Sequence, residues 1–264
     1  MLAAEDFFDL SNWAHPSLFA KGEPVWQTFT RLKSYLSDAL HPNVQELGRY
    51  GPMLRETLVL HQGKLLSTGF DLLPADVTKG RYQVIQDGEV LEGATVFYAG
   101  AYLMGQDIFV GPGSVVEPGA LIKGPTIIGA YSEIRQGAYI RGQCLVGDRC
   151  VVGHTTEIKH SVMLDGAKAG HFAYIGDSIL GNRTNLGAGT KLANLKMVDT
   201  PIRVKIDGKR HDTGLRKFGA VLGDETETGC NSVTNPGTLL GRRCLVYPAI
   251  SVRGGYYRDH SVIS

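Results

Sequence analysis

The sequence lacks two features that define broad classes of protein, a long apolar run and an excess of one charge. No stretch approaches the roughly 18 apolar residues that cross a bilayer, and Glu5 and Asp6 stand where a secretory signal is basic. The 27 Lys and Arg residues nearly balance the 26 Asp and Glu residues, which leaves a net charge of +1. We therefore expect a cytoplasmic protein with neither a membrane nor a nucleic-acid partner, whose anion sites are local.

Cysteine is also scarce. The 264 residues include 4 cysteines, and none of them forms the C-x-x-C spacing of a metal or redox pair. A chain of this length needs no disulfide to hold its core together. We expect reduced thiols.

Glycine is abundant, and an apolar residue recurs at every sixth position of the glycine-rich region. There are 34 glycines, about 13% where about 7% is usual, and 17 of them fall between Gly100 and Gly189. The apolar series is Met104, Val110, Val116, Ile122, Ile128, Ile134, Ile140, Val146, Val152, Ile158 and Leu164. Mostly small residues stand four positions after each member: Ile108, Ser114, Ala120, Thr126, Ser132, Ala138, Cys144, Cys150, Thr156 and Val162.

A period of six suits short strands joined by tight turns, with one large and one small side chain pointing inward in each hexad. Successive coils then pair their backbones about 4.8 Å apart, and no coil is stable alone. This pattern predicts a mainly β fold, a β-solenoid, in which Cys144, Cys150 and Cys244 fill interior space. The frame slips after Leu164, resumes at Ile175, and returns from Leu222 to Val252.

Residues 193–216 interrupt the hexads, and a long excursion from a regular solenoid is more often functional than accidental. Apolar residues alternate up to Asp207-Gly208, a two-residue hairpin signal. Between Arg203 and Lys217 there are six Lys and Arg residues but only two Asp residues, a local charge of +4. A solvated basic hairpin and an anion-binding arm are both compatible with this composition.

The first 99 residues differ in kind from the repeat. Apolar residues from Val25 to Leu40 follow helical spacing until His41-Pro42, and two later stretches resemble strands joined by glycine turns. We expect a small N-terminal α/β cap over residues 1–99. Its core is expected to contain the early aromatic residues Phe7, Phe8, Trp13, Phe19 and Trp26.

The hexads resemble the left-handed parallel β-helix of the hexapeptide acyltransferases over residues 100–255. The block KAGHFAYIGDS and the motif N-x-GAGT make the chain similar to the acetyltransferase domain of the bifunctional N-acetylglucosamine-1-phosphate uridylyltransferase/glucosamine-1-phosphate acetyltransferase. Related sugar-phosphate nucleotidyltransferases with such a C-terminal β-helix are more similar still. The resemblance implies a homotrimer with active sites between subunits, and residues 100–264 as the acyltransferase-like domain.

Residues 1–99 contain no glycine-rich sequence that cradles a nucleotide phosphate, so we expect no nucleotidyltransferase activity.

The resemblance implies that His171 is the general base, because imidazole can take the proton of an attacking amine at neutral pH. Asn194 aligns with an asparagine beside the base and the pantetheine of acetyl-CoA. Cys230 stands where the family has a serine near the thioester oxygen, and the Gly229 and Cys230 amides are a candidate oxyanion hole. Pro248 replaces an alanine near the acyl group, and Leu195 replaces a tyrosine.

The resemblance also implies a substrate-binding set. It consists of Arg141, Lys159, Tyr174, Asn185 and Lys217. A sugar 1-phosphate is an anion that favours Arg or Lys, and its hydroxyls favour amide and phenol groups. Surface ion pairing is the alternative explanation for Arg141 and Lys159.

These residues predict acetyl-CoA-dependent N-acetylation of an amino-sugar phosphate such as glucosamine 1-phosphate. Two alternatives are a nucleotide-linked amino sugar as acceptor and a non-catalytic trimeric scaffold or sugar-phosphate sensor. We expect no metal: His154, His160 and His171 are spaced by six and eleven residues, unlike the close histidine pair of the γ-class carbonic anhydrases.

Overall fold

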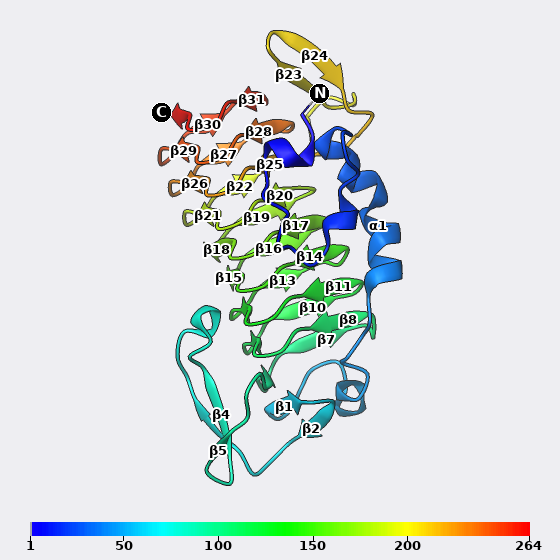
Figure 1. Cartoon of the computed structure of the whole chain (residues 1–264), viewed down its shortest axis with the longest axis vertical. Helices are drawn as coiled ribbons and strands as arrows, with labels where there is room; N and C mark the ends of the chain where they lie inside the picture. The colour runs from blue at the N-terminus through cyan, green and yellow to red at the C-terminus, as the bar shows by residue number, and fades with distance from the viewer. Residues whose placement is uncertain (1) are drawn as a thin grey trace.

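A computed structural model describes residues 2–264, in which three sheets wind around a common axis (Figure 1). Each coil of the chain contributes one strand to each sheet, and the coils pair in parallel. Thr126 lies opposite Cys144 and Glu133 lies opposite Val151, both eighteen residues apart, which is three hexads. The predicted mainly β solenoid is therefore confirmed, whereas the left-handed sense of its coils stays a prediction.

The strands of the solenoid form three sheets. The first sheet contains, in spatial order, β2 (Lys64–Leu66), β1 (Leu58–His61), β6 (Thr95–Phe97), β9 (Val115–Val116), β12 (Glu133–Ile134), β15 (Val151–His154), β18 (Lys168–His171), β21 (Asn185–Leu186), β26 (Glu227–Thr228), β29 (Leu245–Val246) and β32 (Val262–Ile263). The second contains β7 (Tyr102–Met104), β10 (Leu121–Lys123), β13 (Tyr139–Ile140), β16 (Glu157–Lys159), β19 (Tyr174–Gly176), β22 (Lys191–Leu192), β27 (Val233–Thr234) and β30 (Ser251–Val252). The third contains β8 (Ile108–Val110), β11 (Thr126–Ile128), β14 (Cys144–Val146), β17 (Ser161–Met163), β20 (Ile179–Leu180), β25 (Ala220–Leu222), β28 (Thr238–Leu240) and β31 (Gly255–Tyr257).

The core of the solenoid is the predicted apolar column. Nine members of the series are buried in it: Val110, Val116, Ile122, Ile128, Ile134, Ile140, Val146, Val152 and Ile158. Cys144, Cys150 and Cys244 are also buried in this core, which confirms them as interior fillers, and burial raises the pKa of each thiol.

Both ends of the predicted series are wrong. Met104 is 42% exposed, and Leu103 instead lies opposite Ile122. Leu164 is buried outside the column, and Met163 takes the place beside Val146. The frame therefore shifts before Leu164 and not after it, because the chain turns the preceding corner with fewer residues.

That short corner lies between the second and third sheets. Three residues, 141–143, connect Ile140 to Cys144, whereas only Lys159 and His160 connect Ile158 to Ser161. The next coil keeps the short form, since residues 176 and 177 connect Ile175 to Ser178. The short corners bring Lys159 and Asp177 into neighbouring coils at one edge of the solenoid.

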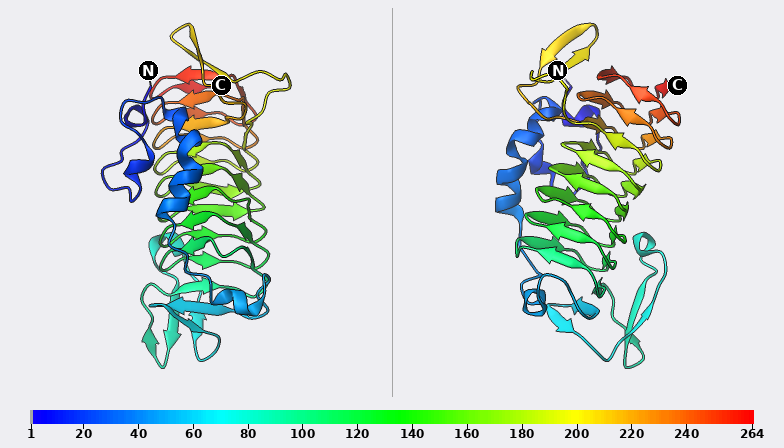
Figure 2. Two further views of the ribbon diagram at one scale, coloured as in Figure 1. Left: turned by 90° about the vertical axis from the view of Figure 1, so that its right-hand side faces the viewer. Right: turned by 180° about the vertical axis from the view of Figure 1, so that it is seen from behind.

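Residues 2–40 lie along the outside of the third sheet, as Figure 2 shows. The segment forms the 3-10 helices η1 (Ala4–Asp6), η2 (Pro16–Leu18) and η3 (Val25–Gln27), then α1 (Thr28–Ala39). Its buried aromatic residues pack against outward-facing residues of the third sheet such as Leu145 and Val221. The early aromatic residues therefore cover the outer face of the third sheet.

Residues 41–97 close the first coil of the solenoid and add a projecting arm. The 3-10 helix η4 (Leu47–Tyr50) precedes β1 and β2, and β1 pairs with β6 in antiparallel orientation. The arm consists of the antiparallel strands β3 (Asp71–Leu73), β4 (Gln83–Gln86) and β5 (Glu89–Val90), together with the 3-10 helix η5 (Val77–Lys79). The division at residues 99 and 100 stays a prediction, because each hydrophobic cluster contains residues from both sides of it.

The excursion at residues 193–216 contains the predicted hairpin. Strands β23 (Arg203–Ile206) and β24 (Lys209–Asp212) pair in antiparallel orientation across Asp207-Gly208. Both turn residues have positive φ, 45° and 82°, which the Asp-Gly pair tolerates. The hairpin lies at the C-terminal end of the solenoid (Figure 1). No helix among residues 2–264 is long and apolar enough to cross a bilayer.

Candidate active site

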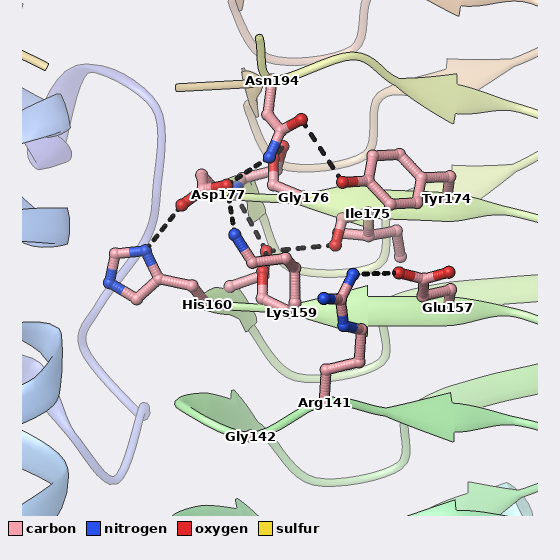
Figure 3. A network of polar contacts seen from close by, with 12 residues as sticks. Arg141, Gly142, Glu157, Lys159, His160, Tyr174, Ile175, Gly176, Asp177 and Asn194 are labelled. Atoms are coloured by element: carbon pink, nitrogen blue, oxygen red, sulfur yellow. Dashed lines mark hydrogen bonds and ion pairs between the residues drawn. The ribbon is translucent and has the colours of Figure 1, made fainter. Parts of the chain in front are cut away.

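A polar cluster surrounds Asp177, at the corner between the second and third sheets (Figure 3). The Asp177 residue is only 3% exposed. Its carboxylate accepts hydrogen bonds from the Lys159 Nζ at 3.1 Å, from the His160 Nδ1 at 2.7 Å and from the Asn194 side-chain amide. Because an ionised carboxylate only accepts, His160 carries its proton on Nδ1. Three donors from two other corners therefore converge on one buried carboxylate.

Burial by itself would raise the pKa of the Asp177 carboxyl. The hydrogen bonds from His160 and Asn194 and the positive charge of Lys159 outweigh it, so the pKa lies below its ordinary value. Asp177 is therefore ionised at neutral pH, and it fixes the positions of Lys159 and Asn194.

The backbone places these groups through the corner geometry. His160 and Asp177 both adopt left-handed conformations, with φ of 44° and 43°. The Asp177 N–H donates to the Lys159 carbonyl at 3.1 Å, and the His160 N–H donates to the Gly142 carbonyl at 3.2 Å. Stacked corners of this kind hold side chains from successive coils about one strand spacing apart. On the outer side, the ring of Phe29 from α1 lies 5.8 Å from the His160 ring.

Tyr174 and Arg141 extend the cluster across the second sheet. The Tyr174 hydroxyl donates to the Asn194 Oδ1 at 3.3 Å, and burial raises the pKa of the phenol. Gly176 makes this contact possible, since a Cβ there would lie 2.7 Å from both the Tyr174 hydroxyl and the Asn194 Nδ2. The Arg141 Nη1 donates to the Glu157 Oε1 at 2.7 Å.

The charges of the cluster are already balanced, with Glu157 facing Arg141 and Asp177 facing Lys159. The guanidinium has five N–H donors and the ammonium has three, so both retain donors for a ligand. The Arg141 side chain is 43% exposed and the Lys159 side chain 21% exposed. This surface offers directed donors without a large net charge, which suits a polar ligand that carries a single anionic group.

The predicted base, His171, lies elsewhere, at the end of β18 in the first sheet. It borders a cavity of about 630 Å³. Three of its lining residues, His171, Asn185 and Cys230, were predicted as site residues. Glu133, Arg135, Lys168, Gly187 and Ala188 also border the cavity. His171 and Cys230 are exposed.

The projecting arm closes one side of this cavity. Asp76 and Thr78 line it, although they precede His171 by more than ninety residues. The Arg149 Nη1 holds the arm by donating to the Thr78 carbonyl at 2.6 Å. Hydrogen bonds from Thr78 and Lys79 lower the pKa of Asp76 to about 2. No motif in the sequence predicts that Asp76 and Thr78 reach this cavity.

The structure therefore divides the predicted residues into two groups. Arg141, Lys159, Tyr174 and Asn194 form the Asp177 cluster, whereas His171, Asn185 and Cys230 line the His171 cavity. Within residues 2–264, no hydrogen bond joins a side chain of one group to a side chain of the other. Lys217 is exposed and pairs through its backbone with Leu195, next to Asn194 at the base of the excursion.

One part of the predicted oxyanion hole is wrong. The Gly229 N–H donates to the Val246 carbonyl at 2.7 Å in the coil ladder, so it is not free to bind a ligand. We find no partner for the Cys230 N–H among the described residues. Pro248 lies directly against Gly229, since a Cβ on Gly229 would be 2.4 Å from the Pro248 nitrogen. Of the two predicted amides, the Cys230 N–H is therefore the one that we find available as a donor within residues 2–264.

Asp177 and Glu157, which bind the two predicted cations, were not predicted as site residues. The sequence feature that could have identified Asp177 is its position in YIGDSIL, where an acidic residue stands between Ile175 and Leu180 of the apolar column. His160 was considered only as a metal ligand. Among the described residues, we find no group of three or more His, Cys, Asp or Glu side chains that could hold a metal ion.

A parallel solenoid of hexads with polar residues on successive coils defines the class of hexapeptide-repeat proteins. Within that class, residues 122–264 match the family described as the GMPPB C-terminal domain, and the chain belongs to this family.

Curated relatives confirm the resemblance to bifunctional nucleotidyltransferase/acetyltransferases. The chain is 36% identical over 115 residues to the bifunctional sugar-1-phosphate nucleotidylyltransferase/acetyltransferase of Sulfurisphaera tokodaii, a match that covers 44% of this chain and 29% of that protein. It is 30% identical over 175 residues to the bifunctional protein GlmU of Synechococcus elongatus, covering 63% of this chain and 33% of that protein. The matched region thus spans about a third of the length of these relatives.

Solved structures with a similar fold include acetyltransferases. The acetyltransferase domain of PglB from Neisseria gonorrhoeae, in complex with acetyl coenzyme A, is 10% identical and matches 65% of this chain and 57% of that one, with a TM-score of 0.27. A GDP-perosamine N-acetyltransferase variant from Caulobacter crescentus, in complex with CoA and GDP-perosamine, is 16% identical, with coverages of 61% and 53% and a TM-score of 0.26.

Proposed function

We propose that the protein transfers an acetyl group from acetyl-CoA to the amine of an amino-sugar phosphate such as glucosamine 1-phosphate. The main support is the Asp177 cluster, where three predicted substrate-binding residues, Arg141, Lys159 and Tyr174, lie beside Asn194. The names of the curated relatives, which include a sugar-1-phosphate nucleotidylyltransferase/acetyltransferase, agree with this substrate class.

The Asp177 cluster binds the acceptor in this proposal. The free donors of Arg141 and Lys159 take the phosphate oxygens, because guanidinium and ammonium groups form charge-assisted hydrogen bonds with phosphate. The Tyr174 hydroxyl and the Asn194 amide take the sugar hydroxyls. Asp177 acts through these residues, since it holds Lys159 and Asn194 in place.

The His171 cavity performs the chemistry. The amine nitrogen of the acceptor attacks the thioester carbon, and His171 accepts the proton that the nitrogen loses. The carbon–sulfur bond then breaks, CoA leaves as the thiolate, and this thiolate takes the proton from His171 to become the free thiol. The Cys230 N–H donates to the oxyanion in this proposal.

Because the two groups lie apart in one chain, the complete site requires two copies. We propose a homotrimer in which the Asp177 cluster of one copy faces the His171 cavity of the next, as the resemblance implies. In a closed ring every copy contributes both halves, so a trimer contains three such sites. Lys217 and the exposed side chains of Met197 and Val198 project from the excursion and are available to the neighbouring copy.

A second candidate is a non-catalytic sugar-phosphate-binding scaffold. The ion pairs that Arg141 and Lys159 already make support it, because the Asp177 cluster is stable without a ligand. Release of free thiol from acetyl-CoA separates the two candidates, measured with glucosamine 1-phosphate, with unphosphorylated glucosamine and with a nucleotide-linked amino sugar. We expect the fastest release with glucosamine 1-phosphate. Thiol release with the nucleotide-linked sugar alone would change the acceptor, and binding of the sugar phosphate without thiol release from any acceptor would favour the scaffold.

A further inference from the structure

The basic hairpin β23–β24 has one face that the fold covers and one that it leaves open. Ile202 and Val204 are fully buried and join the aromatic cluster of the N-terminal segment. Side chains alternate along a strand, so Arg203 and Lys205 point to the opposite side, and both are exposed. The open face of the hairpin therefore carries cations because its other face is held in the core.

The open face borders a hollow of about 440 Å³. Four cations line it, namely Lys196, Arg203, Lys205 and Arg210, together with Thr200, Pro201 and Gly254. The only carboxylate we find paired with any of them is Asp212, 3.5 Å from Arg203, within the part of the chain described. Positive charge is thus concentrated in one concave site of a protein whose net charge is only +1.

The register of the hairpin makes this concentration unfavourable without a ligand. Lys205 lies directly opposite Arg210 on β24, and like charges at paired positions destabilise a strand pair. Across the described residues, we find neither of them in an ion pair. An anion between the two side chains would turn the repulsion into two attractive contacts.

The surroundings hold the hairpin in place at this hollow. The Arg258 Nη2 of the last coil lies 3.3 Å from the Asp207 Oδ1 at the hairpin turn. Gly255 allows a close approach, since a Cβ there would lie 3.2 Å from the Lys205 carbonyl. The Lys196 Nζ donates to the Pro201 carbonyl at 2.9 Å, which fixes the loop beside the hollow.

We infer that this hollow binds the diphosphate group of a nucleotide-type ligand. Four cations exceed what one phosphate monoester, with a charge of about −2, requires. Guanidinium forks match the paired oxygens of phosphate groups, and the volume lies in the usual range for small-ligand sites. The hollow shares no lining residue with the His171 cavity, so it is a third site, apart from both halves of the proposed active site.

Calorimetric titration of the full-length protein with inorganic pyrophosphate at low ionic strength tests this inference. We expect the unmodified protein to bind pyrophosphate. The Lys205→Gln and Arg210→Gln variants should each bind about tenfold more weakly, since each change removes one charge-assisted contact. Lys209→Gln is the matched control: it removes one positive charge from the same hairpin, but Lys209 lies opposite Ile206 on the other face. It should change the dissociation constant by less than about twofold.

Thermal melts without ligand show whether the variants are folded. Lys205→Gln and Arg210→Gln relieve repulsion, so their melting temperatures should equal or exceed that of the unmodified protein. Competition against pyrophosphate by CoA and by a uridine-diphosphate sugar then assigns the source of the diphosphate, and displacement by either one upholds the site. Absence of pyrophosphate binding, or equal losses in Lys209→Gln and Arg210→Gln, would overturn it. Turnover at His171 plays no part in these measurements, so failure of the proposed function would leave the result unchanged.

Discussion

Replacing Asp177 by asparagine removes the negative charge on which three donors converge. The asparagine amide has one acceptor oxygen, so at least one of Lys159, His160 and Asn194 would then face another donor. Breaking a buried ion pair on one side costs about 3 to 5 kcal/mol. The Lys159 side chain is 21% exposed and can recover some hydration, so we expect a loss of about 2 to 4 kcal/mol in the free energy of unfolding.

Urea denaturation of the full-length protein measures this loss. Glu157→Gln is the matched control, because Glu157 pairs with Arg141 on the same sheet, but the two side chains are 34% and 43% exposed. An exposed pair contributes about 0 to 1 kcal/mol. A double change, Asp177→Asn with Lys159→Met, should recover part of the loss because the unpaired ammonium is then gone. If Asp177→Asn costs no more than Glu157→Gln, the Asp177 carboxylate does not organise the cluster.

The pH dependence of the free energy of unfolding tests the role of Asp177 independently. The pKa of Asp177 is lowered in the folded protein, so its contribution is fully present above the unfolded pKa of about 3.9 and is lost as the pH falls through the folded value. The stability difference between the unmodified protein and Asp177→Asn should therefore persist at pH 5, where the carboxyl is still ionised. It should shrink below about pH 4. A difference that grows as the pH falls below about 4 would contradict the lowered pKa.

Three further outcomes are expected. His171→Ala should reduce the rate of thiol release by about 10² to 10⁴, the usual contribution of a positioned base, and an unchanged rate would remove His171 from the mechanism. Gly176→Ala should weaken sugar-phosphate binding because its Cβ would meet Tyr174 and Asn194 at 2.7 Å, whereas Gly48→Ala, with nothing within 4 Å, should have no effect. A thiol-specific reagent should modify only Cys230 in the native protein and all four cysteines after denaturation, since the other three are buried. Rapid modification of a second thiol in the native state would show that the column opens.

The hexad period predicted the fold well because every coil places one large and one small side chain of each hexad in the interior. Nine of the predicted column residues are buried as expected, and the series is wrong only at Met104 and Leu164, where the number of residues in a corner changes. The apolar pattern does not show how many residues each corner contains. The short corners at residues 159–160 and 176–177 contain no apolar residue, so nothing in the pattern distinguishes them from longer corners. The hairpin was predicted because Asp-Gly after an alternating strand is a local signal.

The candidate site was predicted less completely. The resemblance named Arg141, Lys159, Tyr174 and Asn194, but not the carboxylates of Glu157 and Asp177. It implied sites between subunits without indicating which residues lie in the His171 cavity. Contacts made by residues far apart in the chain were also missed. Asp76 reaches the His171 cavity, and the N-terminal segment packs on the third sheet, through interactions that no local pattern encodes.

Division of the site between two copies is tested most directly by mixing two inactive variants. His171→Ala disables the cavity and leaves the Asp177 cluster intact, whereas Arg141→Ala does the reverse. After dissociation and reassembly of an equal mixture into closed rings, about a quarter of the sites should combine two intact halves, so about a quarter of the unmodified thiol-release rate should return. A rate no higher than that of either variant alone would show that both halves act within one chain.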